Sequence, residues 1–169
     1  MKNIAIFGIM ASGKTSGGKL LAKKLGYRFY DTDELIVKRA GMPISNIFEK
    51  KGEKSFRRLE SSVINALSKK KKCVIALGGG AITVPKNIKA LKKSSMVVSL
   101  MSSVSAIMRR TAKDSSRPLL NVANRRKKIQ ELIRKRKALY VKHADLVIDT
   151  SKLTPVQIAE KIKTFLLSK

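Results

Sequence analysis

A glycine-rich octapeptide near the start of the chain constrains its fold more than any other feature. Residues 8–15 read Gly-Ile-Met-Ala-Ser-Gly-Lys-Thr and match the phosphate-loop pattern, in which four residues separate a glycine from Gly-Lys-Thr. The glycines let successive backbone N–H groups turn toward a polyphosphate at the N-terminus of a helix. The pattern needs a strand before it and a helix after it, and the sequence predicts both. We therefore expect nucleotide binding, with an ordinary glycine-containing turn as the alternative.

Short apolar runs predict the rest of the sheet. They are almost continuously hydrophobic, which is typical of strands covered on both faces in a parallel sheet. Five such runs occur, at residues 3–7, 27–30, 73–77, 96–100 and 146–149. Helical patterns occur at 15–25, 44–67 and 154–167, and a long basic helix contains 125–128 and 134–137. The sequence therefore predicts an α/β fold, a doubly wound domain with five parallel strands and helices on both faces.

The composition restricts the class of protein. The chain has 169 residues, of which 43% are hydrophobic and 29% charged, which suits one soluble domain spanning residues 1–169. No run approaches the roughly 20 apolar residues of a membrane-spanning helix, and a buried strand explains the apolar start better than a signal peptide does. The one cysteine, Cys73, excludes an internal disulfide and a zinc site built from thiolates. We therefore expect a cytoplasmic monomer that does not bind membranes.

The net charge favours anionic partners. Lys and Arg outnumber Asp and Glu by 38 to 11, which gives a formal charge of +27. A nucleic-acid-binding ATPase is therefore an alternative function from a different class. However, aromatic residues make up only 5% of the chain, tryptophan is absent, and no motif for reading nucleic acids is present. We expect non-specific binding to polyanions and no specific nucleic-acid partner.

Acidic residues and glycines follow two of the predicted strands. Asp31 and Asp33 alternate at a strand end and could both face bound phosphate or substrate, and a helix cap in a solvated turn is an equally supported alternative. The three glycines at 78–80 allow either a floppy turn or the close approach of a ligand to the backbone. The strand before them lacks the terminal acid that usually helps to hold Mg²⁺. We therefore expect Thr15 and Asp31 to hold this ion.

Taken in order, the motifs of this chain resemble those of the shikimate kinases. Besides the phosphate loop, the resemblance rests on Phe29-Tyr30-Asp31-Thr32-Asp33, Ile47-Phe48-Glu49, Gly52-Glu53, Phe56-Arg57, Gly78-Gly79-Gly80, Arg117-Pro118-Leu119-Leu120, and Arg136 with Leu139-Tyr140. It implies a P-loop kinase domain of the nucleoside-monophosphate-kinase type, with a substrate-binding segment at about 32–60 and a lid at about 112–124. The implied reaction is Mg²⁺-assisted phosphoryl transfer from ATP to the 3-hydroxyl of shikimate, in aromatic amino-acid biosynthesis. A kinase of another small metabolite is the nearest alternative.

The resemblance also implies roles for individual residues. In catalysis it implies Lys14, Asp33 and Arg117. For the nucleotide it implies Ala11, Ser12, Gly13, Lys14, Thr15, Ser16, Arg110 and Arg117, with Arg110 packed on adenine and Arg117 at the transferring phosphate. For shikimate it implies Asp33 at the hydroxyls, Arg57 and Arg136 at the carboxylate, and Gly78, Gly79 and Gly80 at the ring. Ala11 departs from the family's usual glycine, and Lys137-Ala138 stands where proline is common.

Overall fold

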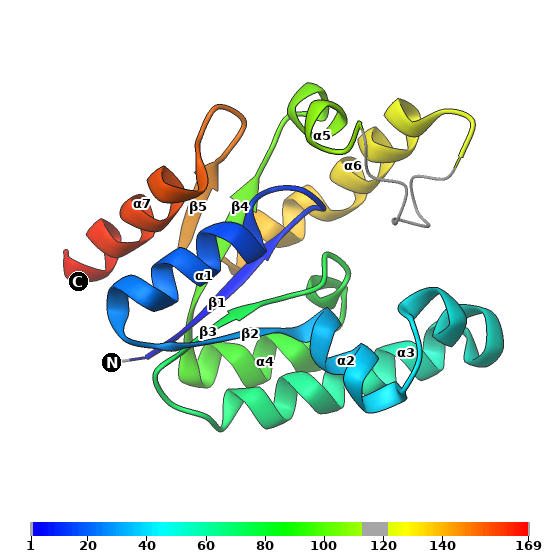
Figure 1. Cartoon of the computed structure of the whole chain (residues 1–169), viewed down its shortest axis with the longest axis horizontal. Coiled ribbons are helices and arrows are strands. Elements are labelled where there is room, and N and C mark those ends of the chain that lie inside the picture. The colour runs from blue at the N-terminus through cyan, green and yellow to red at the C-terminus, as the bar shows by residue number, and fades with distance from the viewer. Residues whose placement is uncertain (1, 113–121, 169) are drawn as a thin grey trace.

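Five parallel strands form the centre of the molecule (Figure 1). The computed structural model describes residues 2–112 and 122–168. Its strands are β1 (Asn3–Gly8), β2 (Arg28–Asp31), β3 (Cys73–Ala76), β4 (Ser95–Met101) and β5 (Leu146–Asp149). They are ordered β2-β3-β1-β4-β5, with Ile4 paired to Val74 on one side and to Met96 on the other. The predicted strands and the α/β fold class are therefore confirmed.

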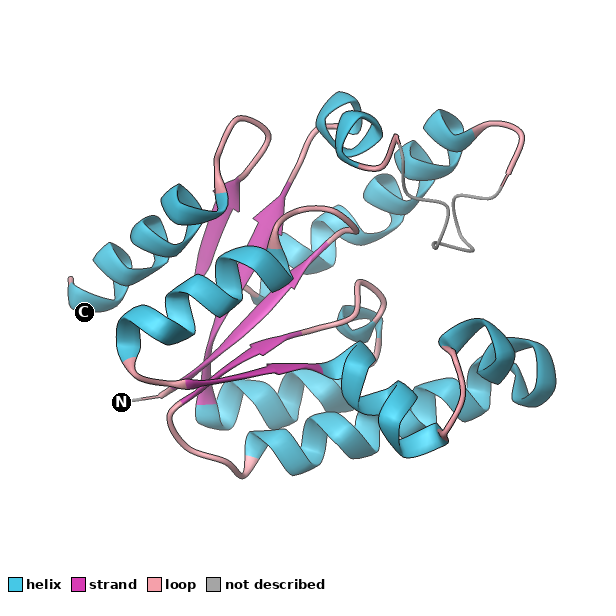
Figure 2. Cartoon of the chain, viewed as in Figure 1, coloured by secondary structure: helices cyan, strands magenta, loops and turns pink. Residues whose placement is uncertain are grey.

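Helices cover both faces of this sheet (Figure 2). They are α1 (Lys14–Leu25), α2 (Thr32–Ala40), α3 (Ile44–Ser68), α4 (Pro85–Ser94), α5 (Val104–Arg110), α6 (Arg125–His143) and α7 (Pro155–Leu167), with a short 3₁₀ helix, η1 (Ala81–Thr83). Ile4 and Ile6 of β1 pack in a cluster with α1 and α7, while Ala5 and Phe7 pack with α2, α3, α4 and α6. Alternate residues of a strand point to opposite faces, so one apolar strand supports two buried cores.

Local signals fix several helix ends. Gly26 ends α1 with φ 65°, as its position in the sequence predicts, and Thr154 forms a capping box with Gln157 at the start of α7. The helical pattern over 44–67 is confirmed as α3, but the helix is interrupted at Gly52, which was not predicted. This residue has φ 73° and ψ 168°, so α3 consists of two helical pieces that meet at a break. Glycine adopts this conformation without the clash that a side chain would cause.

Helix α7 packs directly against the phosphate loop and the first turn of α1. A Cβ atom at Gly13 would lie 2.7 Å from the Ile158 side chain, and one at Gly17 would lie 2.9 Å from it. Both separations are shorter than carbon atoms tolerate, so only glycine permits this approach. The glycines therefore bring the loop that follows β5 close to the phosphate loop.

The predicted lid lies mostly outside the residues that the structure describes. The lid expected at about 112–124 falls largely within 113–121, which is outside the described residues, and so does Arg117. Across 2–112 and 122–168, none of the helices combines the length and the apolar character needed to cross a bilayer.

Candidate active site

The phosphate loop connects β1 to α1 at the carboxyl edge of the sheet. A Cβ atom at Gly8 would lie 2.6 Å from the Ser12 hydroxyl, which shows how tightly the loop closes. Gly13 begins α1 with φ 94°, and Ala11 has φ 55°, which is unusual for a residue with a side chain. The ammonium of Lys14 donates hydrogen bonds to the carbonyls of Gly8 at 2.9 Å and Ile9 at 2.8 Å. The loop therefore has the curled backbone and the central cation that bind a polyphosphate.

Two side chains fasten this loop to the ends of β4 and β5. The Arg110 guanidinium donates to the Ala11 carbonyl at 3.0 Å, to the Ser102 hydroxyl at 3.2 Å and to the carbonyls of Thr150 and Leu153. The Thr150 hydroxyl is buried and lies 2.9 Å from the Ser12 carbonyl and 3.0 Å from that of Met101. Arg110 thus lies beside the phosphate loop and lines the adjoining cavity, while its predicted packing on adenine stays a prediction.

Asp31 forms the helix cap that its sequence position allowed, and it also contacts the first turn of α1. One carboxylate oxygen accepts a hydrogen bond from the Asp33 amide at 3.0 Å and caps α2, while the other accepts from the Thr15 hydroxyl at 2.8 Å. The cap fixes the carboxylate, because the backbone of α2 is rigid. Thr15 and Asp31 therefore present oxygen atoms together beside the phosphate loop.

These groups open onto a cavity of about 960 Å³. Its lining includes Ala11, Gly13, Lys14, Thr15, Ser16 and Arg110 from the nucleotide-binding prediction, and also Asp31 and Asp33. Leu153, Pro155 and Ile158 add apolar surface from the segment that follows β5. The cavity therefore combines a charged end at the phosphate loop with an apolar wall, as a nucleotide pocket requires.

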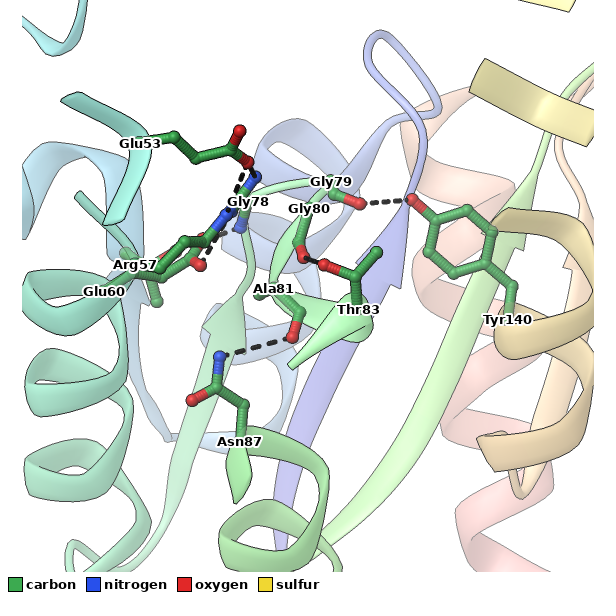
Figure 3. Close-up of polar contacts among 11 residues, drawn as sticks. Glu53, Arg57, Glu60, Gly78, Gly79, Gly80, Ala81, Thr83, Asn87 and Tyr140 are labelled. Carbon is green, nitrogen blue, oxygen red and sulfur yellow. Dashed lines mark hydrogen bonds and ion pairs between the residues drawn. The ribbon is translucent and has the colours of Figure 1, made fainter. Parts of the chain in front are cut away.

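A second group of residues surrounds Arg57 on α3 (Figure 3). Its guanidinium donates to Glu60 at 2.8 Å and to Glu53 at 3.3 Å, and it lies over the Phe56 ring at 5.2 Å. Glu60 is fully buried, whereas the Glu53 side chain is 67% exposed. The short, buried bond to Glu60 therefore holds Arg57 in place more firmly than the exposed bond to Glu53 does.

The glycines 78–80 form a hydrogen-bonded turn, which argues against the floppy alternative, while the close approach of a ligand stays a prediction. Their backbone groups bond to side chains from several elements: the Gly78 amide to the Thr32 hydroxyl at 3.0 Å, the Gly79 carbonyl to Tyr140 at 2.7 Å, and the Gly80 carbonyl to Thr83 at 2.8 Å. Added side chains would collide with Asp33 at Gly78 and with Arg57 at Gly80. The turn is therefore rigid and lets acidic and basic side chains approach its backbone closely.

Arg136 reaches the same turn from α6. Its guanidinium would lie 3.3 Å from a Cβ atom at Gly79, and the buried Tyr140 one turn further along α6 bonds to the Gly79 carbonyl. Burial raises the pKa of Tyr140 to about 12, against an opposing effect of the Arg136 charge. Arg134 is exposed, while Arg136 is only partly so. The structure therefore brings Arg136, and not Arg134, to the glycine turn.

Glu60 links the charges of this region. Burial raises the pKa of its carboxyl group, Arg57 and Arg136 act to lower it, and Asp33 acts to raise it. All three charges therefore act on one buried carboxylate. The second oxygen of Glu60 has no hydrogen-bond partner among the residues that the structure describes. Asp33, Arg57 and Arg136, which the sequence separates by up to about 100 positions, thus surround one small region beside Gly78 to Gly80.

Comparison with known proteins shows the family to which the chain belongs. A sequence model described as shikimate kinase matches residues 10–167. The chain belongs to the shikimate kinase family.

Similarity to individual shikimate kinases extends over almost the whole chain. The enzyme of Thermodesulfovibrio yellowstonii is 49% identical over 162 residues, which is 96% of this chain and 93% of that protein. The structure of the Acinetobacter baumannii enzyme in complex with shikimate has a TM-score of 0.95 at 40% identity, covering 99% of this chain and 94% of that one. The Aquifex aeolicus enzyme has a TM-score of 0.85 at 34% identity, covering 98% and 96%. The resemblance seen in the sequence motifs is therefore confirmed.

Two residues of this shikimate kinase site carry no role in the sequence analysis. Glu60 holds Arg57, and a signal for it existed, because residues three positions apart lie on one face of a helix. Thr150 supports the phosphate loop from the end of β5, 138 positions away in the sequence. No local pattern reveals such a contact, because it depends on how the strands are ordered in the sheet.

Proposed function

We infer that this chain catalyses the transfer of the γ-phosphoryl group of ATP to the 3-hydroxyl of shikimate, giving shikimate 3-phosphate and ADP. Membership of the shikimate kinase family carries this inference. The geometry supports it, because a phosphate loop and a pair of arginines beside a glycine turn flank the same acidic residue, Asp33. In aromatic amino-acid biosynthesis, the product is an intermediate on the route to chorismate.

The phosphate loop supports the transfer by position and charge. The bond between the γ-phosphorus and the β,γ-bridging oxygen breaks while a bond from the attacking hydroxyl forms, so negative charge shifts toward the bridging oxygen. Lys14 and the amide groups of the loop supply positive potential at that point. Arg110 holds the loop in its curled form from the side of the adenine pocket. Arg117, outside the described residues, completes the proposed catalytic set at the transferring phosphate.

The acceptor groups bind and orient shikimate. Arg57 and Arg136 are proposed to bind its carboxylate, since a guanidinium fork matches the two oxygens. Asp33 is proposed to accept hydrogen bonds from the ring hydroxyls and to take the proton of the attacking hydroxyl. The turn at Gly78, Gly79 and Gly80 lets the ring approach the backbone. Glu60 acts as a positioning residue, because it holds Arg57.

The oxygen atoms of Thr15 and Asp31 fit Mg²⁺. This ion binds to one or two carboxylate or hydroxyl oxygens together with substrate phosphates and water, and these two side chains lie in contact beside the phosphate loop. When bound, Mg²⁺ neutralises charge on the β- and γ-phosphates. The proposed role of the Asp31 cap is to keep one oxygen of the pair fixed. A magnesium titration followed by the chemical shift of labelled Thr15 tests this assignment without turnover.

A coupled ADP-release assay with shikimate, gluconate and nucleoside monophosphates as acceptors tests the function. Shikimate should release ADP well above the intrinsic ATPase rate, and mass spectrometry should find shikimate 3-phosphate in equal amount. ADP release with another acceptor, and none with shikimate above background, would overturn the proposal. The cytoplasmic location and the monomeric state stay predictions, and sedimentation velocity checks the latter.

A further inference from the structure

The amino edge of the sheet, opposite the candidate active site, is lined with lysines. Every segment that leads into a strand carries at least one exposed lysine: Lys2 before β1, Lys23 and Lys24 before β2, Lys69 to Lys72 before β3, Lys92 and Lys93 before β4, and Lys142 before β5. Parallel strands begin at the same edge of a sheet, so segments far apart in the sequence gather there. We name these lysines the basic edge.

Acidic residues do little to neutralise the basic edge. Asp145 is the one acid in the segments that lead into the strands, and its carboxylate accepts a hydrogen bond from the Val97 amide at 2.7 Å. Lys24 pairs with Glu160 of α7, and it is the only lysine of the basic edge with an ion pair among the described residues. The edge therefore carries a net positive charge that few acidic groups offset.

A shallow groove continues from the basic edge along α4. It has a volume of about 360 Å³ and lies between Asn65 and Ser68 of α3 and the lysines Lys86, Lys89 and Lys93 of α4. Lys93 belongs both to this groove and to the basic edge, and Ser68 directly precedes Lys69. Ammonium, hydroxyl and amide groups are the side chains that bind phosphate oxygens. The groove therefore continues the basic edge as a concave surface between α3 and α4.

We propose that the basic edge and its groove bind the phosphate backbone of a single-stranded nucleic acid, without reading its sequence. Neighbouring strands lie about 4.8 Å apart, so five strands span about 19 Å. A single strand that keeps the axial rise of one strand of a duplex, roughly 3.4 Å per phosphate, would place about five to six phosphates along that length. A flat membrane would meet the lysines but not enter a groove between two helices.

Binding at this edge leaves the candidate active site open. The strands run from the basic edge to the phosphate loop, the glycine turn and Asp33, so the two surfaces lie at opposite ends of the sheet (Figure 1). The proposal therefore predicts that the chain binds ATP and nucleic acid at the same time. This separates it from simple competition of polyanions for the phosphate loop.

Fluorescence anisotropy with a labelled 20-nucleotide oligouridine tests the proposal. The logarithm of the binding constant should fall with the logarithm of salt concentration with a slope of about −3.5 to −4, since each of about five to six phosphates contributes roughly 0.7 for a single strand. Replacing Lys69 to Lys72 with Gln should weaken binding at least tenfold and flatten the slope. Unchanged kcat for ADP release shows that the variant is folded. A 20-nucleotide oligothymidine should bind with similar affinity, because the phosphates are shared.

A matched variant separates this edge from charge in general. Arg126, Lys127, Lys135 and Lys137 are exposed on α6, and replacing all four with Gln also lowers the net charge from +27 to +23. This control should lose less than threefold in affinity. Equal losses in the two variants would show that only net charge matters, and would overturn the proposal.

The single histidine of the chain offers an independent readout. His143 ends α6 at the basic edge, and burial lowers its pKa below 6.5, with further lowering by Lys92 and Lys142. Phosphates bound beside these lysines offset their charge, so saturating oligouridine should raise the midpoint of the His143 NMR titration.

Three further outcomes would overturn the proposal. The first is an unmoved His143 midpoint at saturation. The second is competition between ATP and the oligonucleotide. The third is binding to vesicles of anionic lipid but not to the oligonucleotide.

Discussion

The two edges of the sheet use positive charge in different ways. At the carboxyl edge the cations are few and each has defined contacts: Lys14 bonds to the phosphate loop, Arg57 to Glu60, and Arg110 to four acceptors. At the amino edge the lysines are numerous and exposed, and Lys24 alone has an acidic partner among the described residues. Fixed contacts give each cation one position, whereas exposed lysines keep their rotamer freedom. The cations of the carboxyl edge therefore act through their fixed positions, whereas the lysines of the amino edge act through their summed charge.

The largest difference between the edges should follow from removing one lysine. Lys14→Met should lower kcat by at least about 30-fold, because loss of such a charge costs roughly 2 to 3 kcal/mol at the transition state. Lys71→Met at the amino edge is the control and should leave kcat unchanged. Steady-state ADP release measures both. More than about a tenth of the original kcat in Lys14→Met would contradict the assigned role.

Arg136 tests whether geometry matters within the carboxyl edge itself. Arg136→Ala should raise the KM for shikimate about 10- to 100-fold and change that for ATP little, because a charged hydrogen bond contributes roughly 1.5 to 3 kcal/mol. Arg136→Lys should not restore it, since an ammonium lacks the planar fork. Arg134→Ala, the control, should be silent. A shikimate defect in Arg134→Ala alone would reassign the carboxylate clamp.

Glu60 should show a smaller effect, through Arg57. Glu60→Gln should raise the KM for shikimate about three- to tenfold with little change in kcat, because it weakens the charged bond that orients Arg57. Glu53→Gln, at the exposed partner of the same guanidinium, should change it less than twofold. Initial rates at varied shikimate measure this split between KM and kcat. Equal effects of the two variants would show that burial of Glu60 adds nothing to the positioning of Arg57.

The same Glu60 variant carries a pH signature. Burial raises the pKa of Glu60 above 4.5, so the folded state holds this proton more tightly than the unfolded state does. Its contribution to stability is complete below pH 4.5 and is lost as the pH rises through the raised pKa. The stability of Glu60→Gln relative to the parent chain should therefore increase as the pH rises from about 4.5. Urea unfolding at several pH values measures the difference, and a flat or falling trend would contradict it.

The smallest effects concern two strained residues, one at each edge. Ala11 has φ 55° and Lys72 has φ 53°, and they are the only residues other than glycine with positive φ in the described part of the chain. Changing either to Gly should stabilise the fold by up to about 1 kcal/mol, which is roughly 2 to 4 °C in Tm. Ala11→Gly should also raise the KM for ATP about twofold, because it loosens the phosphate loop, whereas Lys72→Gly should not. Calorimetry and ATP titrations of both variants test this, and matching KM values would show that Ala11 does not stiffen the loop.

The sequence by itself determined the strands, the ends of some helices and the phosphate loop. These features depend on local physics. An apolar run is buried whatever covers it. Gly26 ends α1 through its own backbone conformation, and Thr154 begins α7 through its own hydroxyl. The motifs also predicted Asp33, Arg57 and Arg136 as members of one site, through the order in which they occur. The break of α3 at Gly52 was not predicted, because a glycine inside a helical pattern is compatible with either a helix or a turn.

Only the tertiary structure decided how these residues meet. The sequence left Asp31 open between a helix cap and a functional carboxylate; the structure shows the cap and adds a hydrogen bond from Thr15, while the proposed role in holding Mg²⁺ stays a prediction. It left the glycines 78–80 open between a floppy turn and a ligand surface, and bonds from Thr32, Thr83 and Tyr140 make the turn rigid. The basic edge also arises from topology, since its lysines come from five separate segments. The physical reason is that a parallel sheet aligns strand ends that are distant in the chain, and no local pattern encodes that alignment.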